Sequence, residues 1–200
     1  MSASDEKIMD GALEAAERAN ERLGPGLLVL VVGPSGAGKD TLLAYARRQL
    51  TEHDVLFARR HITRASDHTE DHLSIDFAAF EQGVAEGRFP LHWRANGLGY
   101  ALGEDVREAI QAGRTVVANG SRATVAEARL RFVRIKVVLV TAPFSVLAAR
   151  IAARGREAHD DAAQRMAREP TLDAPPDIGI INDGAIEQAG ERLAAYLAGL

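Results

Sequence analysis

The apolar positions of the chain fall into short continuous runs separated by stretches with helical periodicity. The first run, residues 27–32, is uninterrupted, and a helical pattern from residue 39 to about residue 50 follows it. Residues 115–118 and 135–140 form similar runs, and each precedes a helix-like segment. Continuous runs are typical of parallel strands buried on both faces, and their alternation with helices indicates right-handed crossovers. The pattern predicts an α/β fold with a mostly parallel central sheet.

The ends of the chain carry two further helical patterns. Residues 5–23 place apolar side chains at helical spacing and stop at the glycine–proline cluster 24–26, a strong helix breaker. Residues 185–200 predict a final packing helix. We therefore expect a helical extension over residues 1–24, followed by one domain over residues 25–200.

A glycine-rich segment joins the first predicted strand to the first predicted helix of this domain. It matches the pattern G-x-x-x-x-G-K in the strand-to-helix context that a phosphate-binding P-loop requires. Its glycines let successive backbone N–H groups face inward, and the helix N-terminus adds positive potential for phosphate oxygens. The segment consists of Gly33, Pro34, Ser35, Gly36, Ala37, Gly38 and Lys39. It predicts ATP binding, with the lysine at the β- and γ-phosphates; the alternative is a turn without a ligand.

Asp40 stands where a P-loop usually has a serine or threonine hydroxyl that meets Mg²⁺. A carboxylate is a hard oxygen ligand, so Asp40 is our candidate for holding the metal, directly or through water. The alternative is a carboxylate that only stabilises the helix N-terminus. Thr41 is a candidate for a contact with the α-phosphate.

Two stretches within the domain depart from the strand–helix rhythm. From about residue 61 to 102 the elements are shorter and rich in glycine, histidine, aromatic and acidic residues. This predicts an inserted acceptor-binding region. From residue 144 to about 168 the chain is helical and rich in arginine, and residues 150–168 predict a lid over the nucleotide.

Composition narrows the range of partners. The chain has 200 residues, a formal net charge of -4, and no cysteine, which fits one globular domain and excludes disulfides and thiolate metal sites. This charge disfavours a nucleic-acid surface. The acidic N-terminus does not resemble a secretory signal, and no apolar stretch is long enough to span a bilayer. We expect a cytoplasmic protein.

Several motifs occur in the order seen in guanylate kinases, and together they resemble that group after residue 26. The resemblance is greater to the ribose 1,5-bisphosphate phosphokinase (PhnN) family, which has Gly-Lys-Asp in its P-loop. The motifs that carry it are His61-Ile62-Thr63-Arg64, Glu70-Asp71-His72, Trp93-Arg94-Ala95-Asn96-Gly97 and Asn119-Gly120-Ser121-Arg122-Ala123. This resemblance implies a P-loop NTPase fold and transfer of the ATP γ-phosphoryl group to ribose 1,5-bisphosphate, which yields 5-phosphoribosyl 1-diphosphate.

The departures from guanylate kinases favour the sugar phosphate. Their second acceptor-site arginine is replaced here by residues 65–67, Ala-Ser-Asp, and their acidic residue after the strand by Asn119. Ala101 and Leu102 stand where a small hydroxyl residue helps to read guanine. The resemblance therefore implies that phosphate recognition is retained and guanine recognition is lost.

The candidate residues fall into three groups, and for each side chain the alternative is an ordinary packing or solvated position. The catalytic candidates are Lys39, Asp40, Arg150 and Arg154. The substrate-binding candidates are Arg64, Glu70, His72, Tyr100, Asn119, Arg122 and Arg165. Residues 33–41 and Asn182 are the nucleotide-binding candidates. Arginine suits phosphate oxygens because its planar fork can donate two parallel hydrogen bonds.

Three functions are compatible with the sequence. The first is phosphorylation of ribose 1,5-bisphosphate, a small sugar phosphate, by ATP and Mg²⁺. The second is a nucleoside monophosphate kinase with altered specificity. The third is a nucleotide-binding module without turnover, which the retained Lys39 and the arginine-rich segment disfavour.

Overall fold

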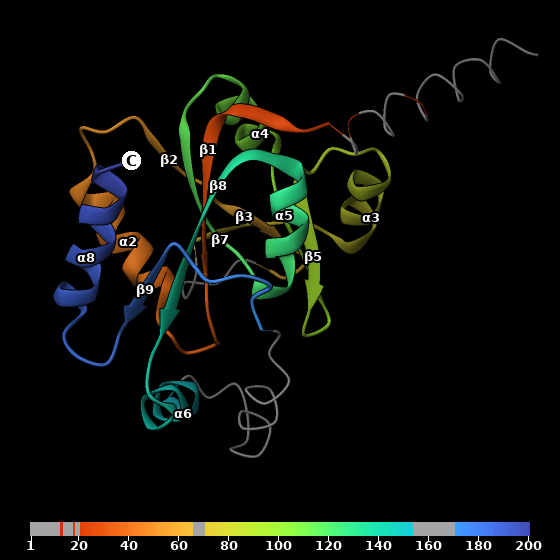
Figure 1. Cartoon of the computed structure of the whole chain (residues 1–200). Coiled ribbons are helices and arrows are strands. Elements are labelled where there is room, and N and C mark those ends of the chain that lie inside the picture. The colour runs from red at the N-terminus through yellow and green to blue at the C-terminus, as the bar shows by residue number, and fades with distance from the viewer. Residues whose placement is uncertain (1–12, 14–17, 19–20, 66–70, 154–170) are drawn as a thin grey trace, which may run out of the picture.

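The first apolar run forms the middle strand of a parallel sheet. The computed structural model describes residues 13, 18, 21–65, 71–153 and 171–200. Its main sheet has the strand order β2-β7-β1-β8-β9, and every neighbouring pair is parallel. The strands are β1 (Leu23–Val32), β2 (Val55–Phe57), β7 (Thr115–Asn119), β8 (Phe132–Thr141) and β9 (Ile178–Ile181). The predicted α/β fold with a mostly parallel sheet is confirmed (Figure 1).

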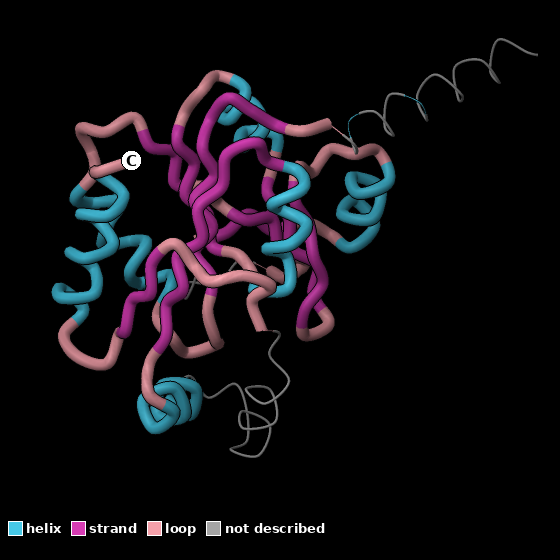
Figure 2. Tube along the Cα trace, in the orientation of Figure 1, coloured by secondary structure: helices cyan, strands magenta, loops and turns pink. Residues whose placement is uncertain are grey.

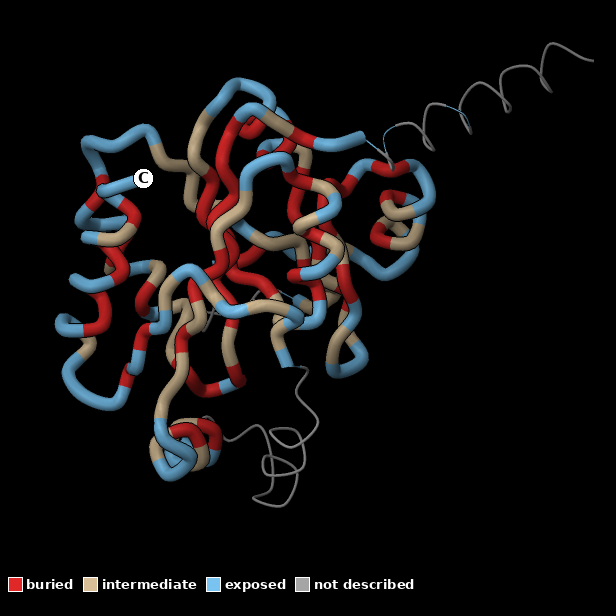
Figure 3. The backbone as a smooth tube through the Cα atoms, viewed as in Figure 1, coloured by how far each residue is buried: buried red, intermediate tan, exposed pale blue. Residues whose placement is uncertain are grey.

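Helices cover both faces of this sheet. On one face lie α2 (Lys39–Gln49) and α8 (Ile186–Ala198), and on the other lie α4 (Glu104–Gln111) and α5 (Val125–Arg131). Side chains of β1 alternate between the two layers, so the strand is buried throughout its second half (Figure 3). Leu27, Val29 and Val31 pack in the core under α2 and α8. Leu28, Leu30 and Val32 pack in the core under α4 and α5. This arrangement explains why the run is continuous rather than alternating.

The residues that follow α2 and β2 in the sequence form a second sheet, whose strands are among those drawn in magenta in Figure 2. Its order is β4-β3-β6-β5, with β3 antiparallel to β6 and parallel to β4. The elements are β3 (Arg60–Ile62), β4 (His72–Ser74), α3 (Phe77–Ala85), β5 (Leu91–Ala95) and β6 (Leu98–Leu102). These short elements occupy the stretch that the sequence assigns to an insertion.

The two faces of the second sheet have different neighbours. His61, His92 and Ala101 lie on the face that packs against Phe80 of α3 and against Phe89. Arg60, Ile62, Trp93 and Tyr100 occupy alternate positions, on the opposite face. This second face is the one that reaches the P-loop, because the side chain of Arg60 contacts Asp40.

The arginine-rich segment is described only in part. It begins with α6 (Phe144–Ala153) after β8, which agrees with the predicted helix. Arg154 and Arg165, and with them most of the predicted lid, lie outside the described residues. Within the described ranges, no helix has the length and apolar character that crossing a membrane requires.

The predicted start of the first strand was wrong. β1 begins at Leu23 and runs through Gly24–Gly26, which we expected to separate a helix from the strand. Leu23 is buried and pairs with Phe132, and the register shifts before Leu27. The backbone of α4 approaches Gly26 so closely that a Cβ there would be 2.7 Å from the Ile110 carbonyl oxygen. Glycine here permits close strand–helix packing instead of ending an element.

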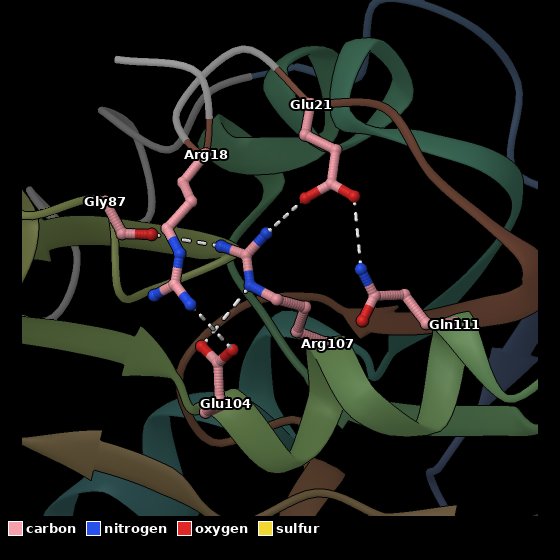
Figure 4. Close-up of polar contacts among 6 residues, drawn as sticks. All are labelled: Arg18, Glu21, Gly87, Glu104, Arg107 and Gln111. Atoms are coloured by element: carbon pink, nitrogen blue, oxygen red, sulfur yellow. Dashed lines mark hydrogen bonds and ion pairs between the residues drawn. The ribbon is translucent and has the colours of Figure 1, made fainter. Parts of the chain in front are cut away.

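A buried arginine attaches the residues before β1 to the domain (Figure 4). Arg107 of α4 is only 4% exposed, and its guanidinium lies 2.8 Å from Glu21 Oε2 and 3.3 Å from Glu104 Oε2. It also donates to the Gly87 carbonyl at 3.0 Å, and Gln111 donates to Glu21 at 3.1 Å. A buried guanidinium needs such acceptors because desolvation of its charge is costly. These contacts join the N-terminal segment, α4 and the turn before β5.

We expect Glu21→Ala to lower the free energy of unfolding by about 1–2 kcal/mol, because Arg107 loses one of its two charged acceptors and keeps Glu104 and the Gly87 carbonyl. Denaturant unfolding followed by circular dichroism measures the change. Glu108→Ala is the matched control, since this exposed glutamate lies on the same helix, and surface changes usually cost less than about 0.5 kcal/mol. Equal midpoints for the two variants would contradict a stabilising role of Glu21.

Candidate active site

The loop between β1 and α2 is curled as the P-loop motif requires. Gly36 and Gly38 have φ angles of 80° and 86°, which glycine adopts far more readily than other residues. A Cβ at Gly38 would collide with Nδ2 of Asn182, and a Cβ at Gly33 would collide with the Val140 carbonyl. The loop therefore needs glycine both for its backbone angles and for its close packing against β8 and the end of β9.

The start of α2 and the side chain of Lys39 face the same loop. The N-cap of α2 is Gly38, which has no side chain to cap the first N–H groups of the helix. Lys39 Nζ donates to the carbonyls of Gly33 at 2.8 Å and Pro34 at 3.1 Å, which folds the ammonium group back over the loop. N–H groups and an ammonium placed in this way suit phosphate oxygens. Thr41, one turn into the helix, is exposed.

Asp40 lies between two side chains that are distant from it in the sequence. Its Oδ1 accepts a hydrogen bond from Asn119 Nδ2 at 2.5 Å and lies 3.6 Å from Arg60 Nη2. Asn119 ends β7 and is buried, whereas the Asp40 side chain remains 44% exposed. Two predicted site residues are thus in contact at the carboxyl edge of the sheet, where ligands bind in open α/β folds.

Arg150 and Asn182 join α6 and the residue after β9 to the P-loop. Arg150 Nη1 donates to the Asn182 carbonyl at 3.0 Å and to the Gly36 carbonyl at 3.5 Å. The Asn182 side chain is buried and donates to the Ala37 carbonyl at 2.8 Å. The side-chain oxygens of Asn119 and Asn182 have no hydrogen-bond partner among the described residues. The side-chain nitrogens of these residues contact Asp40 and Ala37, respectively, and both oxygens can accept a hydrogen bond.

Tyr100 lies on the face of the second sheet that is turned toward the P-loop. Its ring stacks on Trp93, with centroids 5.4 Å apart and planes 6° from parallel. The Arg60 guanidinium lies 5.6 Å from the same ring centroid. Trp93 is buried and packs against Tyr100. The aromatic pair therefore supports an arginine next to Asp40.

The other predicted acceptor residues have more varied environments. Arg64 follows β3 and is half-buried. His72, a candidate for substrate binding, belongs to β4 and is only 2% exposed, so a sugar hydroxyl could reach it only if the chain around it moved. Arg122 starts the short helix η1 (Arg122–Thr124), and burial lowers the pKa of its guanidinium from the ordinary value. Glu70 lies outside the described residues.

Comparison with known proteins gives this geometry its context. The model of the AAA domain family (AAA_18) matches residues 29–170. "Ribose 1,5-bisphosphate phosphokinase PhnN" of Methylobacterium radiotolerans is 53% identical over 174 residues, covering 86% of this chain and 98% of the relative. The protein of the same name from Bradyrhizobium diazoefficiens is 43% identical, covering 88% of this chain and 89% of the relative. The chain belongs to the PhnN family.

A solved structure agrees at the level of the fold. The crystal structure of guanylate kinase from Anaplasma phagocytophilum matches with a TM-score of 0.61 at 17% identity, covering 90% of this chain and 87% of that one. The PhnN chain thus has a guanylate-kinase-like P-loop fold. Membership of a family whose relatives are named phosphokinases makes it a phosphotransferase. The alternative of a nucleotide-binding module without turnover is therefore wrong.

Arg60 is the main residue of this site that sequence reasoning missed. It directly precedes the His61–Arg64 motif, and the period of two in a strand places it on the same face as Ile62. That alternation is a signal that could have drawn attention to it. Its contact with Asp40, however, joins the second sheet to the P-loop, and no local pattern in the sequence predicts such a contact.

The residues of the PhnN chain fit a metal that is shared with the nucleotide. Among the described residues, no group of three or more histidine, aspartate or glutamate side chains could hold an ion by itself. Mg²⁺ commonly uses one or two carboxylates, water and substrate phosphates instead of a complete protein cage. The partly exposed carboxylate of Asp40 next to the P-loop meets that requirement.

Proposed function

We propose that this kinase transfers the γ-phosphoryl group of ATP to the 1-phosphate of ribose 1,5-bisphosphate and produces 5-phosphoribosyl 1-diphosphate and ADP. The observation that carries the proposal is the 53% identity to a ribose 1,5-bisphosphate phosphokinase over nearly the whole length of that relative. The second sheet supports it, because Arg60 on its inner face contacts Asp40 beside the P-loop and also lies next to the Tyr100 ring.

The chemistry needs position and charge more than a base. An oxygen of the acceptor phosphate forms a bond to the γ-phosphorus, and the bond from that phosphorus to the bridging oxygen of ADP breaks. The acceptor oxygen is already an anion, so no side chain has to remove a proton. Lys39 and the first N–H groups of α2 would hold the β- and γ-phosphates, and Arg150 would lie beside them.

The remaining candidates complete two subsites. Asn182, which contacts the loop carbonyl of Ala37, is proposed for the adenine side, and Arg154 and Arg165 are proposed for closure over the nucleotide. Arg64, Tyr100 and Arg122 are proposed for the acceptor, with Glu70 and His72 for its hydroxyls. Mg²⁺, held by Asp40, would neutralise phosphate charge.

The product identifies the reaction. Purified protein, ATP, Mg²⁺ and ribose 1,5-bisphosphate are incubated, and the phosphorus is followed by ³¹P NMR. We expect two mutually coupled resonances of a new diphosphate, while the 5-phosphate remains a monoester. Release of inorganic phosphate from ATP without a new diphosphate on the sugar would contradict the proposal.

We expect Asp40→Asn to raise the Mg²⁺ concentration for half-maximal activity about tenfold, because a neutral amide is a weaker ligand for a hard cation. The KM for the acceptor should change less. Asp105→Asn is the matched control: Asp105 is the second residue of α4, as Asp40 is of α2, so both carboxylates interact with a helix N-terminus. An unchanged metal requirement in Asp40→Asn would leave only this helix-stabilising role.

A further inference from the structure

Arg60 lies where the second sheet meets the nucleotide side of the site. It begins β3, and its side chain is 13% exposed. One nitrogen lies 3.6 Å from Asp40 Oδ1, and the guanidinium carbon lies 5.6 Å from the centroid of the Tyr100 ring. The arginine therefore lies between the Asp40 carboxylate beside the P-loop and the Tyr100 ring on β6, the neighbouring strand of its own sheet.

The contact between Arg60 and Asp40, at 3.6 Å, belongs to the longer ion pairs of this protein, with Arg131–Glu127 at 3.7 Å and Arg18–Glu104 at 4.0 Å. Arg59 approaches Asp71 to 2.7 Å, and other pairs are as short. Charge-assisted hydrogen bonds are typically about 2.7–2.9 Å long, so the contact of 3.6 Å between Arg60 and Asp40 is an ion pair without a short hydrogen bond. Asp40 also accepts the short hydrogen bond from Asn119, so its carboxylate stays anchored if Arg60 moves away.

The environment of Arg60 favours an anion as its partner. The side chain is largely removed from water, and arginine keeps its positive charge at any physiological pH. The Arg60 guanidinium packs on the Tyr100 ring, which in turn stacks on Trp93. This packing keeps the guanidinium next to Asp40, where the second sheet contacts the P-loop side of the site. A planar guanidinium can donate two parallel hydrogen bonds to a phosphate.

We infer that Arg60 binds the acceptor phosphate that receives the γ-phosphoryl group, and exchanges its long contact with Asp40 for phosphate oxygens. The inference rests on the proposed function, in which the reacting phosphate must lie beside Lys39 and Asp40. An acceptor with two phosphates requires more than one cation, and Arg60 adds to Arg64 and Arg122, two arginines that the sequence motifs supply.

The test compares two arginines of the same sheet. Arg94 of β5 has the same kinds of contact, because its guanidinium pairs with Glu81 and lies 5.5 Å from the Phe80 centroid. These contacts are on the face away from the P-loop. We expect Arg60→Gln to raise the KM for ribose 1,5-bisphosphate about 30- to 100-fold. The KM for ATP should change less than about threefold, and Arg94→Gln should leave both values unchanged.

A binding measurement without turnover separates substrate contact from a structural role. Trp93 is the single tryptophan of the chain and stacks on Tyr100, which Arg60 also contacts. Titration of ribose 1,5-bisphosphate in the absence of ATP should change the Trp93 fluorescence of the unmodified protein. In Arg60→Gln the half-saturation concentration should rise by the same factor as the KM, while Arg94→Gln should titrate like the unmodified protein.

The outcomes distinguish this inference from the proposed function. If the unmodified protein does not phosphorylate ribose 1,5-bisphosphate, the proposed function fails, and the inference that rests on it fails too. If it does so and folded Arg60→Gln has an unchanged KM and an unchanged Trp93 titration, only the role of Arg60 is overturned. Equal losses for ATP and acceptor would show that Arg60 only holds Asp40, which also contradicts the inference.

Discussion

Replacing Lys39 with alanine is expected to lower kcat about 10³-fold, because the ammonium group stabilises charge that shifts in the transition state. The effect should exceed that on ATP binding, since the glycine-rich backbone and the start of α2 remain. In the structure, Lys39 Nζ donates to two carbonyls of the loop, those of Gly33 and Pro34. These hydrogen bonds are partly buried, and each contributes about 1.5–3 kcal/mol because the donor is charged. The close packing of Gly33 and Gly38 also holds the loop, so the fold should survive.

Initial rates of ADP release with saturating ATP and acceptor measure this effect, and circular dichroism verifies the fold. Lys136→Ala is the matched control, because the Lys136 ammonium pairs with Asp177 at 2.8 Å. Lys136 lies on β8 opposite Val29, in the middle of β1 and before the P-loop begins at Gly33. Near-normal turnover in folded Lys39→Ala would exclude P-loop chemistry for this protein.

Ribose 1,5-bisphosphate is expected to exceed GMP in kcat/KM by about 10⁴-fold, because a site that lacks polar partners for a base leaves the polar groups of that base unpaired. Ala101 and Leu102, the two residues after Tyr100, are apolar and fully buried in the structure. Ala101 packs with Phe80 and Phe89, and Leu102 belongs to the core under α4. Neither residue offers a side-chain hydrogen-bonding group to guanine.

A coupled assay with GMP, AMP and ribose 1,5-bisphosphate at equal concentrations measures this discrimination. Arg64→Ala should weaken acceptor use while ATP binding stays nearly unchanged, because Arg64 follows β3 in the second sheet rather than the P-loop. A higher kcat/KM for GMP than for the sugar phosphate would replace the proposed function by that of a nucleoside monophosphate kinase.

The sequence alone determined the central part of the fold. Residues 27–32 are apolar at every position because helices cover both faces of β1. A continuous apolar run of this kind can be recognised from the local sequence. The P-loop was equally predictable, since Gly36 and Gly38 need positive φ angles and Lys39 follows them at once. Helices α2 and α8 were predicted close to their observed bounds because their periodicity is local.

Only the tertiary structure decided which distant side chains meet. It placed Leu23 in β1 through the buried pairing with Phe132, although the neighbouring glycines resemble a helix end. It buried His72 in a strand and brought Arg60 to Asp40 from another sheet. These contacts depend on the packing of segments that are far apart in the chain, and packing geometry leaves no periodic signal in the residues on either side.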